Sequence, residues 1–156
     1  MNPAELKTMR EAVGLSVPDL AALTSVQERT VRYWEAGRNH VPPDVEALVL
    51  GIDQQLDALV DQVMAVVREQ IAGHGGSPAD TVLLRYRENA DLWHFRPDFK
   101  PLPTTTHGAL LARCRAALAD LNVKTRIVYM EPQAYAQWLE GCKDSEALRS
   151  EWAALQ

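Results

Sequence analysis

The chain has 156 residues and a mass of 17.4 kDa, which allows one domain or two small ones. Apolar residues make up 47% and charged residues 24% of it, so the chain is neither disordered throughout nor collagen-like. Its net charge is −5, and any contact with a polyanion must therefore come from a local basic patch.

Cysteine usage and the lack of long apolar runs predict a cytoplasmic protein. Cys114 and Cys142 form no CxxC pair and no disulfide framework, which is typical of a reducing environment. The first residues contain acids among apolar side chains, without the apolar core of a signal peptide. No stretch of about 18 uncharged apolar residues is present, so we expect no membrane partner.

Two short helices are predicted within the first 24 residues. The first ends at Gly14, because glycine readily adopts the left-handed conformation that closes helices. The second begins after Ser16, whose side chain forms an acidic variant of the capping box with Asp19, and runs to about Thr24. The apolar face of the first helix consists of Leu6, Met9 and Val13.

A third short helix is predicted from about Glu28 to Ala36, ended by Gly37. Val31 and Trp34 are expected on its buried face. Together with a tight break before it and the small Ala21 in the second helix, this order has the features of a helix-turn-helix.

The polar face of the third helix is the candidate DNA-binding site. Arginine can bond the O6 and N7 atoms of guanine, and glutamine can pair with adenine. Glu28 either accepts a hydrogen bond from cytosine or only caps the helix, and the whole face has the alternative of being merely solvated. The residues expected at DNA are Gln27, Glu28, Arg29, Arg32, Tyr33, Arg38 and Asn39.

A long helix follows Pro42 and Pro43 and is expected to continue to about Ala72, over roughly 43 Å. Apolar residues recur along it at intervals of three and four. This apolar stripe needs a partner, which is either the C-terminal segment or a second copy of the chain. Residues 1–72 are therefore predicted to form one domain.

Residues 73–79, rich in glycine, are predicted to be a linker to a small α/β unit over residues 80–156. Its expected order is β-α-β-α-α, with residues 91–103 as a loop. The expected elements are strands Thr81–Arg87 and Lys124–Met130 and helices Thr104–Leu121, Pro132–Gly141 and Ser145–Leu155. Because two strands make a poor independent sheet, this unit is expected to dimerise and pool strands. The fold class is thus mainly α, with a small C-terminal α/β dimerisation unit.

The sequence LSVPDLAALTSVQERTVRYWEAGR at residues 15–38 resembles the helix-turn-helix of XRE/Cro–C1-type repressors, whose loose pattern is LSxxxLAxxxGVxxxTVxxWExGR. It departs from that pattern at Ser25, where the family usually has glycine. A residue other than glycine in a left-handed turn costs roughly 1–2 kcal/mol, so either the turn differs or this cost is carried. The resemblance implies base reading by Glu28, Arg29, Arg32 and Tyr33. It also implies a structural pair between Arg10 and Glu35.

A narrower resemblance covers the stretch from Arg29 to Val45. It is similar to YdiL-like proteins and to phage repressors that autoregulate anti-CRISPR operons. Proteins of these kinds append a C-terminal dimerisation domain, and some also bind RNA. The resemblance therefore implies a dimeric autorepressor of an inverted-repeat operator. The alternative is an antitoxin or RNA-binding regulator whose C-terminal half binds a partner.

Residues 44–67 hold five acids and no base, whereas residues 85–126 hold eight bases and four acids. The eight bases are called the basic band below. They lie on an exposed sheet face, pair with the acids of residues 44–61, or form a second surface for RNA or flanking DNA. Trp93, Phe95 and Phe99 either stack on bases there or cover the small core. The basic band consists of Arg85, Arg87, Arg96, Lys100, Arg113, Arg115, Lys124 and Arg126.

No pattern in the sequence predicts an enzyme, a metal site or a cofactor. His94, His107, Asp91 and Asp98 lack the spacing of a metal site. His107 and Cys114 share a helical face but lie about 10 Å apart along it, too far for a thiolate–imidazole pair. We therefore expect a binding protein without catalytic residues.

Overall fold

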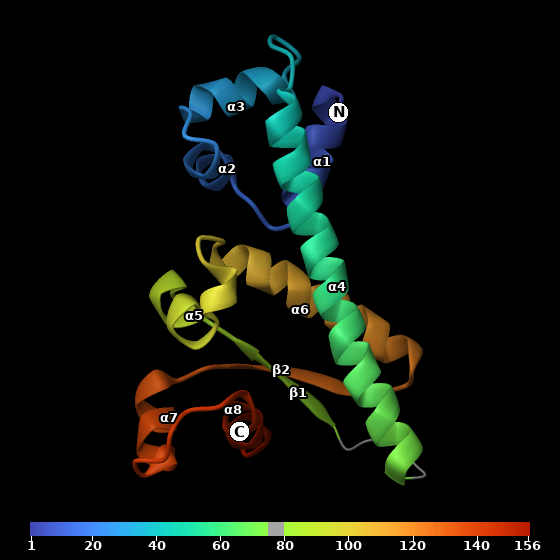
Figure 1. Ribbon diagram of the computed structural model, residues 1–156, viewed down its shortest axis with the longest axis vertical. Helices are drawn as coiled ribbons and strands as arrows, with labels where there is room; N and C mark the ends of the chain where they lie inside the picture. Colours follow the sequence, from blue (N-terminus) through green and yellow to red (C-terminus); the bar gives the residue numbers. More distant parts are fainter. Residues whose placement is uncertain (75–79) are drawn as a thin grey trace.

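The computed structural model describes residues 1–74 and 80–156 of the chain. The fold is mainly helical with one two-stranded sheet, as predicted (Figure 1). The predicted linker over residues 73–79 lies largely outside the described residues. Its first two residues, Gly73 and His74, belong to the long helix, which continues beyond the expected end at Ala72.

Three short helices, α1 (Pro3–Ala12), α2 (Val17–Leu23) and α3 (Glu28–Glu35), form the N-terminal part. The predicted capping box of Ser16 and Asp19 is present at the start of α2. Gly14, after α1, has a φ of 74°, the left-handed conformation expected of a residue that ends a helix. Local signals therefore place the beginnings and ends of these helices.

The long helix α4 (Pro43–His74) extends from the three short helices to the C-terminal part (Figure 1). Near its start, Val49 and Ile52 are buried in the main core, to which α1, α2 and α3 and also the C-terminal helices contribute. Farther along, Met64 and Val67 are buried with residues of the C-terminal part in a second cluster. Of the two partners considered for the apolar stripe, the C-terminal segment of the same chain covers these positions.

The C-terminal part places two parallel strands next to helices. The register pairs Thr81 with Thr125 and Arg85 with Tyr129. Helix α6 packs on α4 and on both strands, α8 packs on β1, and α7 packs on α8. The elements are β1 (Thr81–Arg85), α5 (Asn89–Phe95), the 3-10 turn η1 (Pro97–Phe99), α6 (Thr104–Asp120), β2 (Thr125–Tyr129), α7 (Pro132–Leu139) and α8 (Glu146–Ala154).

The prediction of a loop over residues 91–103 is wrong for its first half. Helix α5 runs over Asn89–Phe95 and is followed directly by η1. Leu92 and Phe95, one turn apart on α5, are buried in the core. A seven-residue helix has room for only two such positions, so tertiary burial rather than a repeated apolar pattern stabilises it.

Two contacts join the N-terminal part to α6. A Cβ atom at Gly14 would overlap the backbone of Thr105, so the turn after α1 approaches the start of α6 as closely as the two backbones allow. Farther along α6, Arg113 pairs with Asp53 at 2.6 Å and with Asp57 at 2.7 Å, both on α4. The position of the C-terminal part is thus defined by both a close packing contact and ion pairs.

Candidate nucleic-acid interface

The two faces of α3 differ sharply in burial. Val31 is fully buried and Trp34 is 4% exposed, which confirms both as core residues. On the opposite side Glu28, Arg29 and Arg32 are exposed. Because the apolar face of α3 is covered by the rest of the domain, its polar face must point to solvent.

The turn between α2 and α3 has the left-handed residue that the sequence comparison with repressors requires. Ser25 has a φ of 56°, so the turn does not differ from the pattern and the conformational cost is carried. The N–H of Val26 donates to the carbonyl of Ala21 at 2.9 Å and closes the turn. Ala21 is 4% exposed, as expected of the small residue near a helix crossing. The turn therefore sets the direction in which α3 leaves α2.

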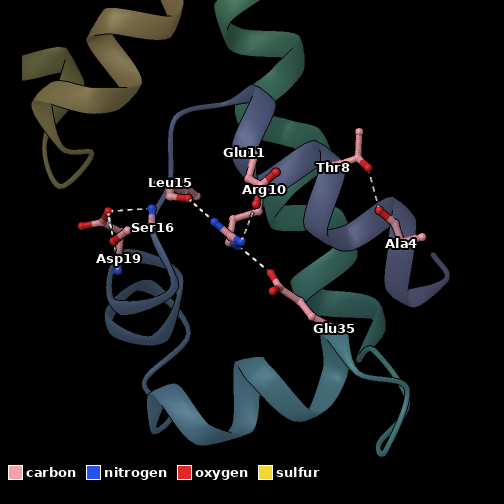
Figure 2. A network of polar contacts seen from close by, with 8 residues as sticks. All are labelled: Ala4, Thr8, Arg10, Glu11, Leu15, Ser16, Asp19 and Glu35. Atoms are coloured by element: carbon pink, nitrogen blue, oxygen red, sulfur yellow. Dashed lines mark hydrogen bonds and ion pairs between the residues drawn. The ribbon is translucent and has the colours of Figure 1, made fainter.

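A buried polar network fixes α3 against α1 (Figure 2). Nε of Arg10 donates to Oε1 of Glu35 at 2.6 Å, which confirms the pair implied by the resemblance. Nη1 of Arg10 donates to the carbonyl of Leu15 at 2.6 Å, and Nη2 lies 3.3 Å from Oε1 of Glu11. One guanidinium thus connects α1, the turn after it and the end of α3. This network defines how the exposed face of α3 is presented.

The exposed residues of α3 interact with one another along the helix. Nη2 of Arg32 lies 2.8 Å from Oε2 of Glu28, one turn earlier. The guanidinium carbon of Arg29 lies 5.2 Å from the centre of the Tyr33 ring, and that of Arg38 lies 5.3 Å from it. Arg38 comes from the loop after α3, so Tyr33 gathers two cations from two segments. The spacing of four between Arg29 and Tyr33 is a signal of this contact that the sequence contains.

The remaining predicted residues lie at the two ends of α3. Gln27 is the exposed N-cap residue, and its side chain makes no capping bond. Asn39 and His40 are exposed in the loop beyond the other end of α3. All seven predicted residues therefore lie on or directly beside α3. Apart from Tyr33, which is half-buried, their side chains are exposed. A helix about 10–12 Å across fits a major groove that is about 12 Å wide.

Of the eight members of the basic band, three pair with acidic side chains that the structure describes. Arg113 pairs with the acids of α4, which confirms for this residue the pairing alternative. Arg96 pairs with Asp98 at 2.8 Å, and Arg87 pairs with Glu131 at 2.8 Å. Within the described residues, the members of the band that make no ion pair are Arg85, Lys100, Arg115, Lys124 and Arg126. Arg85 donates to the carbonyl of Thr104.

The aromatic residues beside the band belong to the core. Phe99 is fully buried and Phe95 is 8% exposed, so neither can stack on a base. Nε1 of Trp93, which is half-buried, donates to the carbonyl of Leu102 at 2.8 Å. The alternative in which these residues cover the small core is the one that the structure supports.

His107 is buried between Tyr86 and Phe99, and both rings meet its imidazole edge-on. Burial, with smaller contributions from the charges of Arg96 and Arg85, lowers the pKa of His107 to about 3. Its Nδ1 atom has no hydrogen-bond partner within the described residues. The same part of the chain contains no group of three side chains able to hold a metal ion.

Residues 4–61 match the family of helix-turn-helix domains, a family associated with XRE-type regulators. The match covers α1, α2, α3 and the first part of α4, the segments that build and present the exposed face of α3. A comparison with curated proteins found no match. None of the described helices is both long enough and apolar enough to cross a membrane.

Proposed function

We propose that this chain, whose residues 4–61 are a helix-turn-helix domain, is a sequence-specific DNA-binding transcriptional regulator of the cytoplasm. In this proposal α3 enters the major groove and reads base edges with its exposed side chains. The observation that carries the proposal is the exposed polar face of α3, held in place by the buried Arg10–Glu35 pair on the other side.

The chemistry of the face suits base reading at its centre and phosphate binding at its end. Arg29 and Arg32 have free donors for guanine O6 and N7. The Glu28–Arg32 pair is exposed and is worth less than about 1 kcal/mol, so a base can replace it. Arg38 and Asn39, in the loop beyond α3, are placed for phosphate oxygens.

We further propose a dimeric repressor that binds an inverted repeat, with two α3 helices about 34–36 Å apart on one side of the DNA. A single short helix contacts only a few base pairs, and two-fold pairing of half-sites is the usual way to reach adequate specificity. The resemblance to YdiL-like and anti-CRISPR-associated repressors supports autoregulation of the protein's own promoter. Arg87, Arg96 and Arg113 of the basic band pair with acids of the fold, and the family match covers the helix-turn-helix, so we favour DNA over RNA as the ligand.

The test is selection of DNA from a random pool, followed by mobility shifts with the full chain at a stated salt concentration. Arg29→Ala and Arg32→Ala should each weaken binding of the selected site by about 1–3 kcal/mol and relax the preference at one base pair. Arg38→Ala should weaken all sequences alike and lower the salt dependence by about one unit. Arg68→Ala, an exposed arginine far along α4, serves as the matched control and should change neither. Unchanged sequence preference in both α3 variants would contradict the proposal.

A further inference from the structure

The outer edge of β2 is unpaired within the described part of the chain. The N–H of Thr81 donates to the carbonyl of Lys124 at 2.9 Å, and the N–H of Met130 donates to the carbonyl of Arg85 at 2.8 Å. In a parallel pair, residues whose backbone groups face the neighbouring strand alternate with residues whose groups face away. The N–H and C=O groups that point away from β1 are therefore those of Thr125, Ile127 and Tyr129.

Of the side chains along this edge, Ile127 is apolar and exposed and Thr125 is half-buried. The ring of Tyr129 lies against Arg87, whose guanidinium carbon is 3.8 Å from the ring centre. Ile127 is 43% exposed and Tyr129 is 47% exposed, and their spacing of two places them on one face of β2. Strand β1, in contrast, is half-buried along its whole length, with α6 and α8 packed on it. Proteins generally cover or charge an edge strand, because free backbone groups beside apolar side chains attract another strand. At the centre of β2 no element covers Ile127 within the described residues, and the charge of the strand lies on the neighbouring Arg126.

We propose that this edge pairs with the same edge of a second copy, antiparallel and about a two-fold axis at Ile127. The proposal deepens the dimer of the proposed function and rests on it. Ile127 then lies opposite Ile127 of the second copy, and Thr125 lies opposite Tyr129. All three outward-facing residues of each strand exchange backbone hydrogen bonds in this register. Two sheets of two strands become one sheet of four strands, a size at which sheets are stable.

Charge selects this register and this occupant. With the axis at Ile127, Arg126 faces Val128 and Lys124 faces Met130, so no like charges lie directly opposite one another. An axis at Thr125 would place Lys124 opposite Arg126, which is unfavourable. With a two-fold axis at Ile127 each copy donates and accepts the same backbone hydrogen bonds, as an interface between identical copies requires.

The experiment is sedimentation equilibrium of the full chain and of three variants, with circular dichroism as a check of folding. The wild type should have twice the mass of the 17.4 kDa chain. Ile127→Lys and Ile127→Glu should each raise the dimer dissociation constant by about 10-fold to 100-fold, because like charges then meet at the axis. An equimolar mixture of these two variants should restore the dimer. Val66→Glu, which charges a residue of α4 that is 55% exposed, is the matched control and should leave the dimer unchanged.

Amide hydrogen exchange gives a second readout that needs no substitution. The amides of Ile127 and Tyr129 should become protected as the protein concentration rises through the dissociation constant. Those of Arg126 and Val128 point to β1 and should be protected at every concentration. A monomeric wild type, dimeric Ile127 variants, or loss of the dimer in Val66→Glu alone would overturn the inference.

The outcomes separate this inference from DNA binding. If the wild type is monomeric and the α3 variants still lose sequence preference, the strand pairing is wrong and DNA reading stands. If the dimer forms as described and the α3 variants bind DNA unchanged, the reverse holds.

Discussion

In the helix-turn-helix domain the buried guanidinium of Arg10 has three acceptors. In the C-terminal part, Nδ1 of the buried His107 has no hydrogen-bond partner among the residues that the structure describes. The first arrangement constrains the angles between helices, because hydrogen bonds are directional. The second is held by aromatic packing, which is less directional. The difference teaches that a buried polar side chain of this fold is held either by directional hydrogen bonds, as at Arg10, or by aromatic packing, as at His107.

The largest effect on stability is expected when the acidic partner of Arg10 is removed, which tests the role of its buried ion pair. Glu35→Ala leaves a charged side chain that is 7% exposed with only one close acceptor and a weaker one, and we expect a loss of about 3 kcal/mol in the free energy of unfolding. Urea denaturation measures this loss.

The double variant Arg10→Met with Glu35→Leu is the control for lost packing. Because it removes both charges and keeps apolar volume, it should recover most of the stability. Without the directional hydrogen bonds of the pair, the orientation of α3 relative to α1 should be less well defined. The sequence specificity of DNA binding should therefore fall while the stability of the fold is retained. A double variant as unstable as Glu35→Ala would show that the hydrogen bonds of Arg10, and not only an unpaired charge, stabilise this position.

The second prediction concerns the buried histidine of the C-terminal part. The folded protein keeps His107 neutral down to about pH 3, whereas the unfolded chain protonates it below pH 6.5. The contribution of His107 to stability is therefore complete above pH 6.5 and is lost as the pH falls from 6.5 towards 3. Between pH 6.5 and pH 5 the free energy of unfolding should fall by about 2 kcal/mol from this residue.

Denaturation at several pH values, with the wild type and His107→Leu, checks this expectation. The variant should lose that part of the pH dependence, and His40→Gln, at an exposed position, should keep it. Equal slopes in the wild type and His107→Leu would mean that the imidazole is protonated in the folded protein.

The smallest expected effect on stability comes from substitutions at two residues in the left-handed conformation, one in each region of the molecule. Ser25 has a φ of 56° and Asn122 has a φ of 57°. Asparagine tolerates this conformation better than serine does. Ser25→Gly should therefore stabilise the protein by about 1 kcal/mol, and Asn122→Gly should change its stability less. Thermal melting of the two variants measures the difference in stability between them. An equal gain in stability in both variants would show that Ser25 carries no greater backbone strain than Asn122.

The features predictable from the sequence are those that depend on residues within about one turn. Ser16 with Asp19 and the left-handed Gly14 mark the ends of their helices in this way, and the exposed face of α3 follows from burial of Val31 and Trp34. The orientation of Arg10 toward Glu35 came from a family resemblance, since no local pattern contains it. Helix α5 could not be predicted because distant core residues, and not its own short pattern, stabilise it.

The basic band shows that the pairing of charges is also hard to predict from the sequence. A count of arginines in residues 85–126 cannot tell which of them meet acids. Arg113 reaches Asp53 and Asp57, which are more than fifty positions earlier in the chain. Only the packing of α6 on α4 decides this, so the number of bases in a segment overstates its free positive charge.

Helix α4 supplies Val49 and Ile52 to one hydrophobic core and Met64 and Val67 to the other. A single continuous helix therefore contributes to both hydrophobic cores. Truncation of the chain anywhere within this helix would expose buried residues of at least one of them. Deleting the C-terminal half would bare Met64 and Val67 and yield a fragment prone to aggregate. The stability of the two parts is therefore coupled through one helix, even though the family match extends over only the first of them.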